Sequence, residues 1–319
     1  MRRRPSHSGG SDYGRRTAGK TRRHNHREAA GCGSGTGRST SPSLRTGGAG
    51  RRGGTGLAVG GGGLGIVGLL VALLFGVDPF SGGSPVPNAL DQGATSDVAE
   101  RCTSEPDAVQ RYDDCFVLKV FNEVNEVWTD EFAARGGNFV EPTLVYFDEA
   151  TQTGCGPASS AVGPFYCPAD ERVYIDLGFL RELQQRFGAP GRSAQAYVVA
   201  HEVGHHVQQV TGTATQVRQL QQQRPSATNR LSVRQELQAD CYAGVWSSVA
   251  DAEGEVAITR DDLEDALGAA EAVGDDRIQE ATQGRVDPES FTHGSGEQRR
   301  QWFLTGFDSG DPTDCDTFS

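Results

Sequence analysis

An uncharged segment of 21 residues, 57–77, limits the folds open to this chain more than any other feature of its sequence. A helix of this length spans about 30 Å, which is the thickness of the hydrocarbon core of a bilayer. We therefore expect one transmembrane helix at 57–77. Seven glycines in the segment leave two alternatives open. One is a Gly-rich linker that runs into a buried helix, and the other is the apolar part of a cleaved signal sequence.

Charge is distributed very differently on the two sides of this segment. Residues 1–56 hold 13 Lys+Arg and 2 acidic residues, a net charge of +11. The other 263 residues hold the remaining 17 basic and 40 acidic residues, a net charge of −23. The positive-inside rule then places the basic head in the cytoplasm and the residues after about 78 outside it. Because an acidic body repels phosphate, nucleic-acid binding by this part is excluded.

The basic head has the composition of a disordered segment. It is rich in Arg, Gly, Ser and Thr, with only isolated large apolar residues such as Leu44, so it cannot bury enough surface to offset its ordering entropy. Residues 78–96 are dense in Pro, Gly and Ser, a composition typical of a flexible linker. The sequence therefore predicts a disordered cytoplasmic head (1–56), a transmembrane helix (57–77), a linker (78–96) and one folded domain (97–319).

Six of the seven cysteines follow the uncharged segment, and an even number outside the cytoplasm favours disulfides. Two pairs that are close in sequence would each close a short loop and leave the last two cysteines as a third pair. The expected bonds are Cys102–Cys115, Cys155–Cys167 and Cys241–Cys315. Six buried free thiols are the alternative, whereas a zinc site made of these cysteines is disfavoured because no C-x-x-C pair occurs.

The folded domain is expected to be an α+β fold, mainly helical with a small β-sheet. Strand-forming residues at 143–147 and 172–177 predict two strands, separated by a loop rich in Gly, Pro and Cys. A Gln-rich stretch at 216–223 is expected to form a polar surface helix. Apolar residues at helical spacing predict further helices over 115–134, 179–187, 194–210, 233–249, 260–273, 277–283 and 296–306.

The helix predicted at 194–210 carries the sequence His201-Glu202-Val-Gly-His205-His206. In this H-E-x-x-H spacing, His201 and His205 lie on one helix face, where both imidazoles can bind a single zinc ion. Glu202 then flanks the metal. There it can take a proton from zinc-bound water as the water attacks a carbonyl, and pass it to the leaving amine. His206 points about 100° away from His205, so we assign it to packing or to a hydrogen bond outside the metal shell.

Catalytic zinc sites have three protein ligands, and Glu236 is the most suitable third donor downstream. Asp240 follows four residues later on the same helix face. From there it can accept the second ring N–H of a zinc-binding histidine and fix the tautomer of that ring. Apolar residues between 237 and 245 indicate that this helix is largely buried, and buried acids need partners. Zn²⁺ is therefore the expected cofactor, bound by Glu236 and the two histidines.

Four segments together make the chain similar to the bacterial family of putative neutral zinc metallopeptidases. They are His201–Gln208, Glu236–Asp240, Gly163–Asp170 and Thr292–Arg299. The resemblance covers roughly residues 97–319. It implies a zincin-like α+β fold related to the glutamate-ligand zinc peptidases, in which a small sheet lies above two helices that carry the metal ligands. The family pattern is matched at all four positions expected in the metal site, namely His201, Glu202, His205 and Glu236.

His293 is the only other histidine of the acidic body. It precedes a loop from Gly294 to Gly296, flexible enough to bring the side chain to a cleft, so it is a candidate donor to the oxyanion formed during hydrolysis. Arg299 begins the next helix and can pair with an acid such as Asp240 or with substrate carbonyls. The related families carry a similar histidine followed six residues later by arginine. A helix-capping loop with a surface His and Arg is the alternative.

These features predict a single-pass, membrane-anchored zinc endopeptidase whose catalytic domain lies outside the cytoplasmic membrane of a bacterium. The expected partners are that membrane and a peptide or protein substrate, which adds as a strand beside residues 172–177. The sequence does not determine the oligomeric state. Two alternatives remain, a zinc-binding envelope factor without activity and an amidase that acts on cell-wall peptides. Metal binding without hydrolysis favours the first, and a strong preference for cross-linked muropeptides favours the second.

Overall fold

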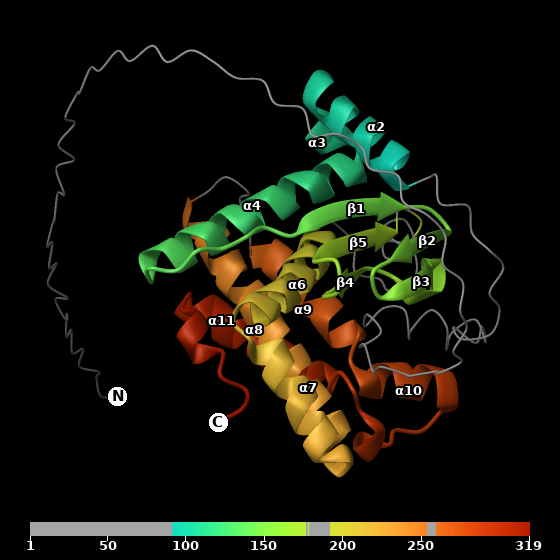
Figure 1. Cartoon of the computed structure of the whole chain (residues 1–319), viewed down its shortest axis with the longest axis vertical. Helices are drawn as coiled ribbons and strands as arrows, with labels where there is room; N and C mark the ends of the chain where they lie inside the picture. The colour runs from blue at the N-terminus through green and yellow to red at the C-terminus, as the bar shows by residue number, and fades with distance from the viewer. Residues whose placement is uncertain (1–90, 177, 179–191, 254–259) are drawn as a thin grey trace, which may run out of the picture. The chain divides into compact units, whose positions relative to one another are not determined.

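The structure is a computed structural model (Figure 1) that describes residues 91–176, 178, 192–253 and 260–319. These residues all belong to the second of the two units into which the chain divides, Val59–Ser319. No helix among them is long and apolar enough to cross a membrane. Three predicted segments lie outside the described residues, namely the head (1–56), the transmembrane helix (57–77) and the helix at 179–187.

The described residues form an α+β fold that is mainly helical. Its helices are α2 (Asp91–Ser104), α3 (Ala108–Arg111), α4 (Asp113–Ala134), α6 (Arg192–Val210), α7 (Thr213–Gln223), α8 (Thr228–Glu253), α9 (Arg260–Ala272), α10 (Asp275–Gln283) and α11 (Gly296–Ser309). Every helix predicted within the described residues is present, with ends that differ by no more than five residues. Helix α2 also includes residues 91–96 of the predicted linker, and the helix packs against β1 and α4.

A three-stranded sheet has the order β1-β5-β4 (Figure 1). Strand β1 (Thr143–Phe147) runs parallel to β5 (Arg172–Asp176), and both match predicted strands. The stretch between them was expected to be a loop, but it contains β4 (Phe165–Cys167) and the antiparallel hairpin of β2 (Ala150–Thr153) and β3 (Gly156–Ser159). These added strands are three or four residues long, too short to show an alternating pattern in the sequence.

The strand order corrects the predicted substrate position. Strand β5 lies between β1 and β4, and at residues 172–174 both of its edges are already hydrogen-bonded, so a substrate strand cannot pair beside this part of the predicted segment 172–177. Strand β4 pairs with β5 on one side only, among the strands that the structure describes. The sheet edge that a peptide could extend on the side of the H-E-x-x-H helix is therefore β4, which packs against α6.

Helix α6 lies at the centre of the helical packing. It contacts α4, α8 and α9 as well as β4, and nearly all of its residues up to Gln208 are buried. A helix that is buried all round belongs to the core, and the same apolar core includes Val120 of α4, Tyr146 of β1 and Trp246 of α8. At Gly204 an added Cβ would lie 3.1 Å from the carbonyl oxygen of Ala239 on α8. This close approach brings the two helices that carry the predicted ligands together.

Helices α8 and α11 also approach closely, at a pair of glycines. An added Cβ at Gly306 would lie 1.9 Å from the carbonyl oxygen of Cys241, and one at Gly244 would lie 2.0 Å from that of Phe303. Both positions therefore require glycine. The contact holds the first turn of α11, which carries Arg299, against the part of α8 that carries the predicted site residues.

Three disulfides link the cysteines in the predicted pairs. Cys102–Cys115 joins α2 to α4, Cys155–Cys167 joins the β2–β3 turn to β4, and Cys241–Cys315 joins α8 to the C-terminal segment. The alternative of six free thiols is therefore wrong for this structure.

Candidate metal centre

Two histidines of α6 and one glutamate of α8 form a largely buried cluster. Nε2 of His201 lies 3.3 Å from Oε2 of Glu236, and Nε2 of His205 lies 3.5 Å from the same oxygen. One potential ligand atom from each of the three residues lies within 4.8 Å of the other two. The structure thus brings together the three residues that the sequence predicts as zinc ligands.

Unpartnered polar atoms indicate what this cluster can hold. Nε2 of His201 and Oε2 of Glu236 are buried without a hydrogen-bond partner among the described residues. Such atoms are costly to bury unless something satisfies them. Two imidazole nitrogens and one carboxylate oxygen are a donor set that zinc prefers, and a cation between them would satisfy both atoms. The residues therefore fit Zn²⁺.

The electrostatics of the cluster also favour a cation. Burial opposes a charge on the His205 ring, but Glu236, together with Glu202 and Gln208, outweighs burial and raises the pKa of His205 to about 9. Burial likewise opposes ionisation of Glu236, yet the adjacent His205 and His201 hold its pKa well below the usual range. The Glu236 carboxylate is therefore ionised and attracts positive charge to this point.

Asp240 fixes the orientation of His201. Its Oδ1 lies 2.8 Å from Nδ1 of His201, so Nδ1 donates and Nε2 faces the cluster. The carboxylate is fully buried and is held by Arg299, whose Nε donates to Oδ2 at 2.9 Å and whose Nη2 donates to Oδ1 at 2.8 Å. Burial would raise the pKa of Asp240, but the charges of Arg299 and His201 lower it to about 2.

The guanidinium of Arg299 is committed to the protein itself. Besides Asp240, it donates to the hydroxyl of Tyr197 at 3.0 Å and to the carbonyl of Val273 at 3.3 Å. The side chain is fully buried, and of the two partners expected for it, Asp240 is the one that it binds. Arg299 therefore holds Asp240 in place, and its guanidinium is fully buried.

Glu202 lies beside the cluster on α6 and is 2% exposed. Burial raises its pKa, and the charges of His205 and His201 together with a hydrogen bond from the Tyr166 backbone offset part of this effect. Its Oε2 is buried and has no hydrogen-bond partner among the described residues. A carboxyl group with a raised pKa and an available oxygen is suited to take up and return a proton.

His206 lies outside the cluster, where the sequence places it. Its Nδ1 is 2.9 Å from the hydroxyl of Tyr166, and its Nε2 is 2.7 Å from the carbonyl oxygen of Val140. Because that carbonyl can only accept, Nε2 donates and Nδ1 accepts. Burial lowers the pKa of His206, which keeps the ring neutral. The ring ties β4 to α6 and so positions the Tyr166 backbone against Glu202.

His293 is buried and fixed by Asp275, which begins α10. Oδ1 of Asp275 lies 3.2 Å from Nδ1 of His293, and Oδ2 accepts the backbone N–H groups of Thr292, His293 and Gly294 at 2.7, 2.6 and 3.0 Å. His293 also interacts electrostatically with Glu236. One carboxylate thus holds the loop firmly, whereas the sequence predicted a flexible loop. His293 is buried, so the alternative of a surface histidine is wrong.

Four residues that support the site are not predicted from the sequence: Tyr197, Gln208, Tyr166 and Asp275. Tyr197 precedes His201 by four residues and Gln208 follows His205 by three, so helical spacing could have identified both as neighbours of the ligands. Tyr166 and Asp275 reach the site only through tertiary contacts, and no local pattern marks them.

An α+β fold with an H-E-x-x-H helix, joined at one buried cluster by a glutamate from a second helix, is an arrangement typical of zinc metallopeptidases. A family model described as "Putative neutral zinc metallopeptidase" matches residues 36–318. The chain belongs to this family.

Two relatives illustrate how similar other members are. "Uncharacterized protein YpfJ" of Escherichia coli K12 is 52% identical over 204 residues, which cover 64% of this chain and 70% of that protein. "Uncharacterized protein Rv2575" of Mycobacterium tuberculosis H37Rv is 43% identical over 258 residues, which cover 78% of this chain and 85% of that protein. No solved structure shows a significant match to the chain.

Proposed function

We propose that this protein is a zinc-dependent endopeptidase anchored in the cytoplasmic membrane, with its catalytic domain outside the cytoplasm. The observation that carries the proposal is the convergence of three potential ligand atoms from His201, His205 and Glu236 within 4.8 Å, two of them buried without a partner. The unpartnered oxygen of Glu202 lies beside the same cluster. This set of groups provides both a metal site and a proton carrier.

The zinc ion, when bound, would act as a Lewis acid that polarises the scissile carbonyl and lowers the pKa of a water molecule. Glu202 accepts a proton from the attacking water and delivers it to the leaving amine. Its burial favours the protonated form that this transfer creates. Asp240 keeps the Nδ1 proton on His201, so that Nε2 presents a lone pair to the metal.

His293 is the proposed donor to the developing oxyanion. Oδ2 of Asp275 accepts the backbone N–H of His293, and Nδ1 of the ring lies 2.9 Å from the Thr292 hydroxyl and 3.2 Å from Oδ1 of Asp275, so the ring has one orientation before substrate binds. When Nδ1 accepts from the Thr292 hydroxyl, Nε2 carries the proton that is donated to the oxyanion. A donor that is already oriented needs no reorganisation when charge appears on the substrate oxygen.

The proposed substrate is an extended peptide that pairs with strand β4. Strand β4 packs against α6, and Tyr166 at its centre contacts both Glu202 and His206. A peptide that adds to this strand would use main-chain hydrogen bonds, which tolerate many side chains. Such binding would suit a peptidase that cleaves substrates of varied amino-acid sequence.

The proposed location rests on charge and on disulfides. The uncharged segment 57–77 follows a head of net charge +11. The three disulfides of the catalytic domain are stable in an oxidising compartment and rare in the cytosol. We accordingly propose a cytoplasmic head (1–56), a membrane helix (57–77) and an extracytoplasmic catalytic domain.

The test is to compare wild-type protein with Glu202→Gln in cells that lack their own copy. Mass spectrometry of new N-termini should find extracytoplasmic proteins that are cleaved only by the wild type. Glu202→Gln should retain zinc and lose at least about a hundredfold in rate, because the proton carrier is lost. Glu126→Gln, on the exposed face of α4, is the matched control and should behave as wild type.

Each other outcome has a defined meaning. Equal cleavage by Glu202→Gln would remove Glu202 as the proton carrier. Zinc binding by a wild-type protein that cleaves nothing would favour the non-catalytic envelope factor. Cleavage confined to cross-linked cell-wall peptides would favour the amidase.

A further inference from the structure

Two side-chain amides connect the ligand His205 to the C-terminal segment. Oε1 of Gln208 lies 2.9 Å from Nδ1 of His205. Nε2 of Gln208 donates to the carbonyl of Gln235 at 2.6 Å and to Oε1 of Gln238 at 3.1 Å. Nε2 of Gln238 then donates to the carbonyl of Cys315 at 3.0 Å. We call Gln208 and Gln238, with these two carbonyls, the amide relay.

The carbonyl of Gln235 determines which end of the Gln208 amide faces His205. A backbone carbonyl can only accept, so the NH₂ group of Gln208 must point toward it. If the amide were reversed, its oxygen would face two acceptors, the carbonyl of Gln235 and Oε1 of Gln238. The oxygen of Gln208 therefore faces His205. Because that oxygen can only accept, Nδ1 of His205 must carry a proton.

The same reasoning applies one step further out. The carbonyl of Cys315 accepts from Gln238, so the NH₂ group of Gln238 faces Cys315 and its oxygen faces Gln208. Cys315 is held by its disulfide to Cys241 of α8. Gln208 is fully buried and Gln238 is 6% exposed, which leaves little room for either amide to turn over.

We propose that Gln208 and Gln238 are positioning residues that fix the tautomer of His205 and so direct its Nε2 lone pair toward the metal. This inference rests on the proposed metal site. The two histidine ligands are then oriented differently. His201 donates to the anionic Asp240, whereas His205 donates to a neutral amide whose direction is set by backbone carbonyls. The relay thus orients His205 without adding another carboxylate beside Glu236.

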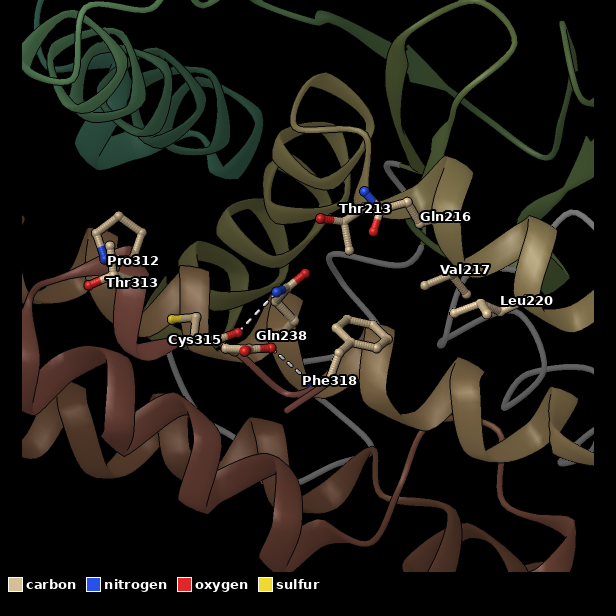
Figure 2. A pocket seen from close by; sticks show the side chains of 10 residues that line it. Thr213, Gln216, Val217, Leu220, Gln238, Pro312, Thr313, Cys315 and Phe318 are labelled. Carbon is tan, nitrogen blue, oxygen red and sulfur yellow. Dashed lines mark hydrogen bonds between the residues drawn. The ribbon is translucent and has the colours of Figure 1, made fainter.

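The outer end of the relay is accessible from a cavity of about 250 Å³. Figure 2 shows Gln238 and Cys315 in its wall, joined by their hydrogen bond, with Val217 and Leu220 of α7 on another side. Gln216 of α7 lines the same cavity, is exposed, and makes none of the relay hydrogen bonds. It therefore offers a matched control for substitutions of Gln238.

The test measures zinc affinity of the full-length protein by competition with a chromophoric chelator, together with the cobalt absorption spectrum and the melting temperature of the metal-free form. Gln208→Met keeps the length of the side chain and removes the acceptor, so zinc affinity should fall about tenfold to a hundredfold, with an altered cobalt spectrum. Gln238→Met should lower affinity by about tenfold or less, because Gln208 keeps its contact to Gln235. Gln216→Met should change neither quantity.

Gln208→Glu separates positioning from general stability. A carboxylate still accepts from Nδ1 of His205, so zinc affinity should stay close to wild type. The same carboxylate faces two oxygens in place of the lost NH₂ group, so the metal-free protein should melt at a lower temperature than Gln208→Met. If Gln208 had only a structural role, the variant with the lower melting temperature, Gln208→Glu, would also have the lower zinc affinity.

Wild-type zinc affinity in Gln208→Met, or equal losses of affinity in Gln208→Met and Gln208→Glu, would overturn the relay. Identical behaviour of Gln238→Met and Gln216→Met would end the relay at Gln208 and so reject the role of Gln238. A wild-type protein that binds no zinc would defeat the proposed metal site itself, and the relay with it. The wild-type measurement therefore distinguishes the two failures.

Discussion

The orientation of His293 depends on a carboxylate at the start of α10. Asp275 binds three consecutive backbone N–H groups and the ring of His293, 18 residues further along the chain. A single buried carboxylate thus sets the path of the loop and the orientation of the ring. The sequence could identify His293 by its chemistry, but the residue that orients it became visible only in the fold.

Replacing His293 by alanine should lower kcat/KM about a hundredfold, the usual loss for one oxyanion donor. Zinc content should not change, because His293 is not among the three ligands. Steady-state kinetics well below the melting temperature would measure the rate, since removal of a buried ring also lowers stability. Loss of zinc in this variant would instead make His293 a ligand, and wild-type kinetics would return it to a structural role.

At the scale of elements, the site depends on how closely α8 and α11 approach. Arg299 on α11 reaches Asp240 on α8, 59 residues earlier, because Gly244 and Gly306 let the two backbones touch. Asp240 in turn orients His201 on α6. Helix packing therefore determines the orientation of His201, a predicted zinc ligand, on a third helix.

Gly306→Ala should destabilise the protein by about 1–3 kcal/mol or more, because the new Cβ would lie 1.9 Å from the carbonyl oxygen of Cys241. The displaced α11 should also weaken the Arg299–Asp240 pair and lower zinc affinity. Gly268→Ala is the control, since Gly268 is exposed in α9 and nothing lies within 4 Å of its added Cβ. It should raise stability by about 0.5–1 kcal/mol in denaturant unfolding. Equal effects of the two substitutions would contradict the close-packing account.

The elements differ in how far the sequence predicts them. Apolar spacing is a local signal, so α4, α6 and α8 were predictable, and H-E-x-x-H placed two ligands on one of them. Strand β4 has three residues and exists because it pairs with β5, a contact that no local pattern encodes. The prediction that substrate pairs beside β5 failed for the same reason. The order of strands in a sheet depends on tertiary contacts, whereas the preference of residues for a β-strand is a local property of the sequence.

At the scale of the whole molecule, the disulfides close loops of very different length. Cys241–Cys315 spans 74 residues, whereas Cys155–Cys167 spans 12. In the chain-entropy view, the longer loop contributes about 4 kcal/mol and the shorter one about 3 kcal/mol. The long bond also anchors Cys315, whose carbonyl ends the amide relay.

Replacing both Cys241 and Cys315 by alanine should therefore lower the free energy of unfolding by about 4 kcal/mol, more than the same change at Cys155 and Cys167. It should also weaken zinc binding, which the second pair should leave nearly unchanged. Denaturant unfolding under non-reducing conditions, together with zinc titration, measures both effects. A larger loss from the Cys155–Cys167 variant would contradict this ranking.

The central claim is that His201, His205 and Glu236 form a zinc site, and metal content tests it most directly. Elemental analysis of the purified full-length protein should find one zinc per chain in the wild type and in the control Glu126→Gln. His201→Ala and Glu236→Gln should each lose most of the zinc. Because each variant lacks a direct ligand, its zinc affinity should fall by more than the roughly hundredfold expected when only a hydrogen-bond partner of a ligand is removed. A wild-type protein without zinc, or full zinc content in both ligand variants, would contradict the account.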